Sequence, residues 1–211
     1  GGAIPLDYKI KIMATTKIDI CARALVMIGA QPITSFTDGS TEALVANNIY
    51  EDIAQSSLCR HRWRFATNQK QISLLAAAPE GRFDYAYQMP TDPIVLQINS
   101  ITVNNYVIPY TRYKNMIYVN GYGSNSELIM DYIYRVGEEF FPPHFILALE
   151  YELASIFAGS VARDSAMIKQ FKELAERQFL VSKNIDSAET TTKVLDTNRF
   201  INLRRSTRTD V

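Results

Sequence analysis

The spacing of apolar residues changes twice along the chain, and this change limits the fold more than any other feature. Apolar residues recur at helical spacing near both ends, whereas the segment from about Phe65 to Val136 is rich in Tyr, Val, Ile and Thr, interrupted by Pro, Gly and Asn. The first pattern predicts amphipathic helices, and the second is typical of short antiparallel strands. Since 47% of the 211 residues are hydrophobic, the chain is large enough to bury a core. We therefore expect a folded α+β protein.

Two helices are predicted before the strand-rich segment. Thr15 or Thr16 can cap the first helix, and Gly29 is placed to end it. Ser40 or Thr41 can cap the second helix. Its expected apolar stripe consists of Ala46, Ile49, Ile53 and Ser57, flanked by Tyr50 and Leu58.

Five strands are predicted in the middle segment. They are Arg82–Gln88, Ile94–Ile98, Tyr106–Tyr110, Met116–Val119 and Leu128–Val136. Pro109 has no backbone N–H, so the strand that contains it is expected at an edge of the sheet. The turn-forming run from Asn120 to Asn125 predicts a hairpin between the last two strands.

A third helix is predicted from about Pro143, which suits the first helical position, to about Gly159. It is apolar on most of its circumference, so it must be covered on several sides, by other helices or by a neighbouring subunit. Its apolar stretch is predicted to be too short to span a bilayer, and it carries Glu150 and Glu152.

A fourth, amphipathic helix is predicted at about Asp164–Val181, and the helical period is lost beyond Lys183. Residues 184–211 are expected to become ordered only against another surface. The predicted divisions are an extension or tag (1–13), an N-terminal helical pair (14–64), an inserted antiparallel β subdomain (65–137), a C-terminal helical pair (138–183) and an extended C-terminal arm (184–211). The simplest packing of the two helical pairs is a four-helix bundle.

Sequence patterns that would support catalysis are missing. The chain has no glycine-rich dinucleotide or phosphate loop and no Gly-x-Ser-x-Gly elbow. Cys59 and His61 have no second ligand pair at a zinc-like spacing, and Cys21 and Cys59 are expected to be free thiols. We therefore predict no catalytic residue, no cofactor, no metal and no enzymatic activity.

Two pairs of carboxylates are expected to have structural roles. Neither Glu138 with Glu139 nor Glu150 with Glu152 has the i,i+3 or i,i+4 spacing that places two side chains on one helix face. If Glu150 or Glu152 is buried, its expected partner is an Arg or Lys, which can come from the next subunit.

Two basic clusters are the candidate interaction sites. The first contains Arg60, Arg62, Trp63 and Arg64, and such a cluster can stack on and charge-match nucleic acid. Its place at the end of the second helix favours a structural or intersubunit role, with the cations complementing the negative helix end. The second cluster contains Phe200, Ile201, Leu203, Arg204 and Arg205. Its interleaved apolar side chains favour a protein partner over DNA phosphates.

The total charge argues against binding of nucleic acid by the whole molecule. Lys and Arg together number 22, as do Asp and Glu. No net field therefore draws the molecule onto DNA or an anionic membrane, and any contact with DNA must be local.

Several motifs follow one another in an order that resembles a known family. They are Ala22-Arg-Ala-Leu-Val-Met-Ile-Gly29, Arg62-Trp-Arg-Phe-Ala66, Tyr87-Gln-Met-Pro-Thr-Asp92, Leu128-Ile-Met-Asp-Tyr-Ile-Tyr-Arg-Val136, Phe141-Pro-Pro-His-Phe145 and the Lys172–Val181 helix. Over roughly Ala14 to Ala188 this order resembles the tail tubular protein A family, the head-to-tail adaptors of short-tailed bacteriophages.

The resemblance implies a helical bundle with a β subdomain that assembles into a twelve-membered ring. Such a ring lies in the virion between the portal protein and the tail nozzle protein and is assembled in the host cytoplasm. Genomic DNA passes through its lumen and contacts it transiently, and no catalytic residue or membrane is involved. The alternatives are a neck or connector protein of a long-tailed phage, or a small nucleic-acid-binding module.

Overall fold

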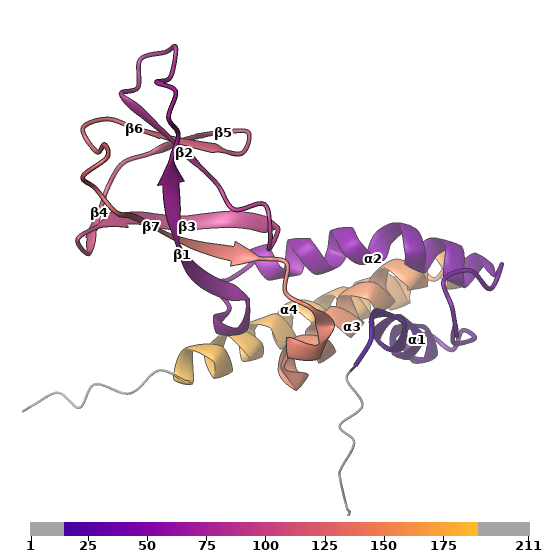
Figure 1. The fold of residues 1–211 in the computed structure, drawn as a ribbon. Helices are drawn as coiled ribbons and strands as arrows, with labels where there is room; N and C mark the ends of the chain where they lie inside the picture. Colours follow the sequence, from indigo (N-terminus) through magenta and orange to yellow (C-terminus); the bar gives the residue numbers. More distant parts are fainter. Residues whose placement is uncertain (1–14, 190–211) are drawn as a thin grey trace, which may run out of the picture.

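The computed structural model describes residues 15–189. Its helices are α1 (Lys17–Met27), α2 (Thr41–Cys59), α3 (Pro143–Phe157) and α4 (Ser165–Ala188), with 3-10 turns η1 (Arg64–Ala66) and η2 (Glu138–Phe140) and a π-helical turn η3 (Ala158–Ala162). Its strands are β1 (Thr67–Leu74), β2 (Tyr85–Gln88), β3 (Val95–Val103), β4 (Tyr106–Val107), β5 (Thr111–Tyr113), β6 (Met116–Val119) and β7 (Leu128–Tyr134). The sheet lies at one end of the molecule and the helices at the other (Figure 1).

The helix starts follow from local capping. Thr16 and Asp19 form a capping box at the start of α1, and Ser40 accepts a hydrogen bond from the backbone N–H of Ala43 at the start of α2. Gly29 adopts a φ of +76° just after α1, a conformation that favours glycine. These starts and the end of α1 confirm the sequence prediction.

The buried face of α2 differs from the predicted stripe. Ala46 and Ser57 of the predicted stripe are buried, as predicted. Ile49 and Ile53 are only half-buried, whereas the neighbouring Tyr50 and Ala54 are buried. The contact face of α2 is therefore rotated slightly from the predicted one, toward Tyr50 and Ala54.

All seven strands form one antiparallel sheet in the order β4-β3-β7-β1-β2-β6-β5. The two edge strands are close in sequence, since β4 ends at Val107 and β5 begins at Thr111. At ~3.4 Å per residue that connection spans roughly 14 Å at most, so the two edges must lie near each other and the sheet must curl. The curled sheet is a half-barrel with its own core.

The core of the sheet is filled from its inner face. The buried side chains are Ile72, Tyr87, Met89, Ile101, Val103, Ile108, Ile117, Val119, Leu128, Met130 and Tyr132. Tyr87 shows how a polar group is accommodated there, because its hydroxyl donates to the carbonyl oxygen of Tyr122 at 3.0 Å. The edge position predicted for the strand near Pro109 is confirmed, because β4 is an edge strand.

The helices group around α3, which contacts α1, α2 and α4. Every residue of α3 after Pro143 is buried or half-buried. The chain itself thus supplies the cover that this apolar helix needs, and a neighbouring subunit is not required for it.

α3 and η3 together form a continuous helical segment, Pro143–Ala162, that is long and apolar enough to cross a membrane by length and composition. The prediction that this stretch is too short was wrong, because the helix continues past Gly159 through η3. The core helix of a soluble protein passes the same test, and half of this window is buried inside the molecule.

The predicted four-helix bundle with an inserted β subdomain is wrong. The fold is mixed α+β, but a seven-stranded sheet with its own core takes the place of a small insertion. Moreover, α1 and α2 contact each other at few positions, and the helical part is organised by α3. The size of the sheet was underestimated because β1 and β5 were not predicted, and β1 is the strand that joins the two halves of the sheet.

Two further predictions need correction. The last two strands do not form a hairpin, since β6 pairs with β2 and β5, whereas β7 pairs with β1 and β3. The run from Asn120 to Asn125 therefore connects two separated strands. In addition, α4 continues to Ala188, well past the predicted end at Val181.

Candidate interaction surfaces

The first basic cluster lies where the helices meet the sheet. α2 ends at Cys59, and the chain then turns through Trp63 into η1 and β1. Trp63 is fully buried, its indole N–H donates to the carbonyl oxygen of Ser57 at 3.1 Å, and its ring lies 5.2 Å from that of Phe145. A buried indole with a satisfied N–H cannot stack on a nucleic-acid base, so the nucleic-acid interpretation loses its main stacking residue.

The Arg60 side chain ties three helices together. Its guanidinium lies 3.0 Å from a carboxylate oxygen of Glu152 in α3 and 3.1 Å from one of Glu176 in α4. It also stacks over the ring of Phe179, 4.4 Å from the ring centroid. Arg60 therefore acts within the chain, and its ion pairs replace the predicted contact with the negative end of α2.

Arg60 and Trp63, with the residues that they contact in α3 and α4, form a joint between the helices and the sheet. Asp186 also belongs to this joint, and its role was not predicted from the sequence. Its carboxylate accepts a hydrogen bond from the backbone N–H of Arg64 at 3.1 Å and lies 3.4 Å from Nε2 of His61. The side chain is only 5% exposed. The signal that could have found it is spacing, because Phe179, Ser182 and Asp186 recur at i,i+3 and i,i+7 on one helix face.

The other two arginines of the cluster are exposed. Arg62 donates to the carbonyl oxygen of Asn99 in β3 at 3.5 Å, a long hydrogen bond. Arg64 lies at the start of η1. The structure thus divides the predicted site, with Arg60 and Trp63 inside the joint and Arg62 and Arg64 at its surface.

The buried carboxylates of α3 find partners in their own chain. Glu150 lies 3.3 Å from Arg23 of α1, and Glu152 lies against Arg60. Burial raises the pKa of Glu150, and Arg23 only partly opposes this because its own side chain is about half exposed. The predicted Arg partners are therefore confirmed, and both belong to the same chain.

A second ion-pair network joins α2 to the end of β7. Arg135 donates to Glu51 at 2.7 Å and also pairs with Glu138, which accepts a hydrogen bond from the Tyr50 hydroxyl at 3.0 Å. Burial alone would lower the pKa of Arg135, but the hydrogen bonds to the two carboxylates outweigh it and raise the pKa. Burial raises the pKa of Tyr50, and the neighbouring Glu138 carboxylate raises it further. These contacts all lie within the chain and connect α2 to the segment that follows β7.

The thiols show no sign of activation. Cys21 is buried, which raises its pKa to about 12, and Cys59 is exposed with a pKa also raised by partial burial. A thiol with a raised pKa holds little of the nucleophilic thiolate. Within residues 15–189, no group of three or more His, Cys, Asp or Glu side chains is placed to hold a metal ion.

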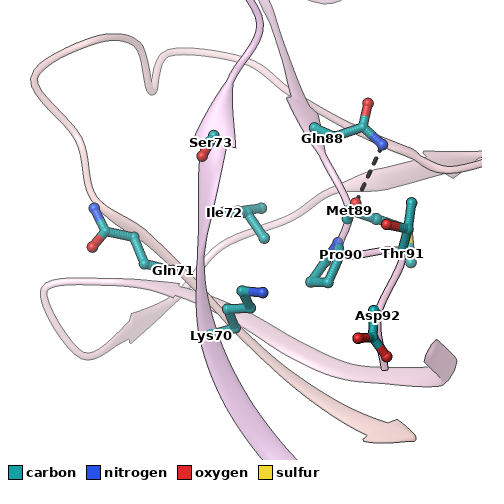
Figure 2. A pocket seen from close by; sticks show the side chains of 9 residues that line it. All are labelled: Lys70, Gln71, Ile72, Ser73, Gln88, Met89, Pro90, Thr91 and Asp92. Atoms are coloured by element: carbon teal, nitrogen blue, oxygen red, sulfur yellow. Dashed lines mark hydrogen bonds between the residues drawn. The ribbon is translucent and has the colours of Figure 1, made fainter. Parts of the chain in front are cut away.

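One hollow lies where β1 passes from β7 to β2 (Figure 2). It has a volume of about 330 Å³. The residues that line it are Lys70, Gln71, Ile72, Ser73, Gln88, Met89, Pro90, Thr91 and Asp92. Six of these nine residues are polar by type. Gln88–Asp92 belong to a motif of the resemblance, but no site was predicted there.

Exposed apolar side chains lie at the sheet edge formed by β4. Tyr106 and Val107 are 77% and 72% exposed. They follow a tight turn at Asn104 and Asn105, both of which have positive φ. Such a pair at an unpaired strand edge is a surface that suits contact with another chain.

The second predicted cluster, Phe200, Ile201, Leu203, Arg204 and Arg205, lies outside the described residues. Comparison with known proteins does not place the chain in a family, because no family model matches it and no curated protein is similar to it.

Proposed function

We propose that this chain is a structural subunit of a ring, a head-to-tail adaptor between the portal protein and the tail nozzle protein of a short-tailed bacteriophage. The ordered sequence motifs from Ala14 to Ala188 support this assignment. It does not depend on the bundle architecture that the resemblance implied, and it requires no enzymatic activity.

The observation that carries the assembly part of the proposal is the unpaired β4 edge. Tyr106 and Val107 are consecutive, apolar and largely exposed on a two-residue edge strand, one on each face of the sheet. A second group of exposed apolar side chains, Leu180, Val181 and Ile185, lies on the last turns of α4. Contacts between two different surfaces of the same subunit are heterologous, and heterologous contacts close into rings when the rotation between subunits is suitable.

Electron microscopy of the purified full-length protein tests the proposal. We expect ring particles with a central hole, formed alone or on addition of the portal protein. A protein that stays monomeric in sedimentation and in micrographs, even when mixed with portal rings at high concentration, would contradict it.

A further inference from the structure

An aromatic hollow lies between the loop that joins β1 to β2 and the hairpin of β5 and β6. It has a volume of about 370 Å³ and is lined by Pro79, Glu80, Gly81, Arg82, Phe83, Tyr113 and Tyr118. Ile117 points into the core of the sheet, so Tyr118 points to the opposite, outer face. Tyr113 is paired with Met116 and points the same way. The loop projects beyond the sheet, away from the helices, so the hollow is open to another molecule (Figure 1).

Three aromatic rings form one wall of the aromatic hollow. The ring centroid of Tyr118 lies 5.5 Å from that of Phe83 and 5.6 Å from that of Tyr113. The Tyr113 side of this wall is still uncovered, since Tyr113 is 51% exposed. Aromatic rings attract a further ring in offset or edge-to-face contact. The wall therefore suits an aromatic side chain that comes from outside.

The charged residues that line the aromatic hollow are one of each sign. The guanidinium of Arg82 lies over the ring of Phe83, 5.3 Å from its centroid, and Glu80 is exposed. A cationic or an anionic ligand would each meet a like charge here, which disfavours both. A side-chain amide can accept from the guanidinium and donate to the carboxylate. The lining therefore favours a neutral segment that carries amides beside an aromatic ring.

The chain carries such a segment at the tip of its β3–β4 hairpin. Asn104 and Asn105 form the turn, both with positive φ and both exposed, and Tyr106 follows them directly. Val103, which is buried in the core of the sheet, pairs with Tyr106 and holds the tip in place. The Tyr106 side chain is 77% exposed, so it does not fill the aromatic hollow of its own molecule.

We propose that the hairpin tip of one copy, Asn104–Tyr106, docks in the aromatic hollow of a second copy of this chain. The ring of Tyr106 lies against Tyr113 and Tyr118, and the amides of the turn bond to Glu80 and Arg82.

The contact joins two different surfaces, so each docked pair keeps one free tip and one free hollow. Repetition of such a contact closes into a ring when the rotation between copies is suitable. The inference rests on the proposed ring, since it names the contact between its subunits. In this arrangement the surface that receives the β4 hairpin is the aromatic hollow and not the end of α4.

Crosslinking between two differently tagged chains tests the docking. In a Cys59→Ser background, a chain with Val107→Cys is mixed with a chain with Gly81→Cys and treated with a short bismaleimide. Both positions are open, because Val107 is 72% exposed and a Cβ at Gly81 meets nothing within 4 Å. We expect a crosslinked dimer with one chain of each kind, at least about tenfold more abundant than with Ser56→Cys in place of Gly81→Cys.

Two outcomes of this crosslinking would overturn the docking. One is an equal yield with the Gly81→Cys and Ser56→Cys chains. The other is a Val107→Cys chain that crosslinks mainly to itself, because the β4 edges would then face each other.

A substitution at the tip shows whether Tyr106 anchors the contact. Tyr106→Ala in the Val107→Cys chain should reduce the yield of the crosslinked dimer at least about tenfold, because an aromatic anchor in a hollow carries much of the binding energy. Phe140→Ala, which removes a ring that is 63% exposed elsewhere on the molecule, is the matched control and should leave the yield unchanged. Equal yields in the two variants would overturn the docking of Tyr106.

Electron microscopy of the natural chain separates this inference from the proposed function. Rings that form without the specific crosslink would overturn the docking alone. A specific crosslink in a chain that never forms rings, even with portal protein, would support the docking and contradict the adaptor.

Discussion

At the scale of single residues, the joint between helices and sheet depends on charged side chains that are paired within the chain. Arg60 contacts Glu152, Glu176 and the ring of Phe179. The Glu152 side chain is only 14% exposed, so it depends on this partner for compensation of its charge. A cluster that suggested DNA binding from composition is therefore explained largely by packing.

Arg60→Ala should destabilise the fold by about 1–3 kcal/mol, because it leaves a half-buried carboxylate without its ion pair and uncovers Phe179. Arg62→Ala is the matched control, since Arg62 is exposed and makes one long hydrogen bond. That control should change the free energy of unfolding by less than about 0.5 kcal/mol. Urea denaturation compares the two variants, and equal losses would show that Arg60 is not part of the joint.

Glu150 provides a prediction about pH. Burial raises the pKa of Glu150 in the folded chain above its value in the unfolded chain. At pH values just above the usual pKa of Glu, the folded chain therefore binds more protons than the unfolded chain. The contribution of this group to stability therefore falls as pH rises through that window. Glu150→Gln removes the titration, and its stability relative to the natural chain should increase between about pH 4 and pH 7. Urea midpoints across this range provide the measurement.

A matched substitution at an exposed carboxylate, Glu173→Gln, controls for a simple change in net charge. If the two variants show the same dependence on pH relative to the natural chain, burial of Glu150 is not the cause.

At the scale of elements, the sequence predicted helices better than strands, for physical reasons. Helix caps are local, and Thr16, Ser40 and Asp164 are all found at helix starts. β1 was missed because four of its residues in a row are exposed and polar, so it lacks the alternation that marks a half-buried strand. The hairpin was wrong because a turn signal at Asn120 shows a reversal of the chain but not the partner of the next strand.

The true end of α4 was hidden for a related reason. Its last buried positions are Ser182 and Asp186, which are polar. The Ser182 hydroxyl donates to the carbonyl oxygen of His144 at 2.8 Å, and Asp186 accepts from the backbone of Arg64. These contacts are tertiary, so the spacing of apolar residues could not reveal them.

Asp186→Ala should therefore loosen the last two turns of α4. It removes the acceptor for the Arg64 N–H and the partner of His61, and it leaves that N–H unsatisfied. Amides from Lys183 to Glu189 should then exchange faster, while those of α3 keep their protection. Asn184→Ala, at an exposed position of the same turns, is the control. Equal exchange in both variants would show that Asp186 does not hold this end of α4.

At the scale of the whole molecule, an aromatic cluster of the helical core lies where the chain passes from α2 to β1 and from β7 to α3. Phe65 lies 5.0 Å from Phe145, which is 4.9 Å from Phe141 and 5.2 Å from Trp63. Edge-to-face contacts of this kind hold the two connections between the sheet and the helices against α3. The candidate surfaces for assembly are therefore carried on a rigid base, with β4 at one end and α4 near the joint.

The β4 edge gives the sharpest test of assembly. The double variant Tyr106→Lys with Val107→Lys adds charge to an exposed strand edge, so it should change the free energy of unfolding of the monomer by less than about 0.5 kcal/mol. If the edge joins subunits, the same charges face an apolar partner and should reduce the measured mass in light scattering at concentrations where the natural chain assembles. Ser56→Lys, on the exposed face of α2, controls for added charge. Assembly that persists unchanged in the double variant would exclude β4 as the joining surface. Burial of two lysines without partners in an interface would weaken assembly measurably.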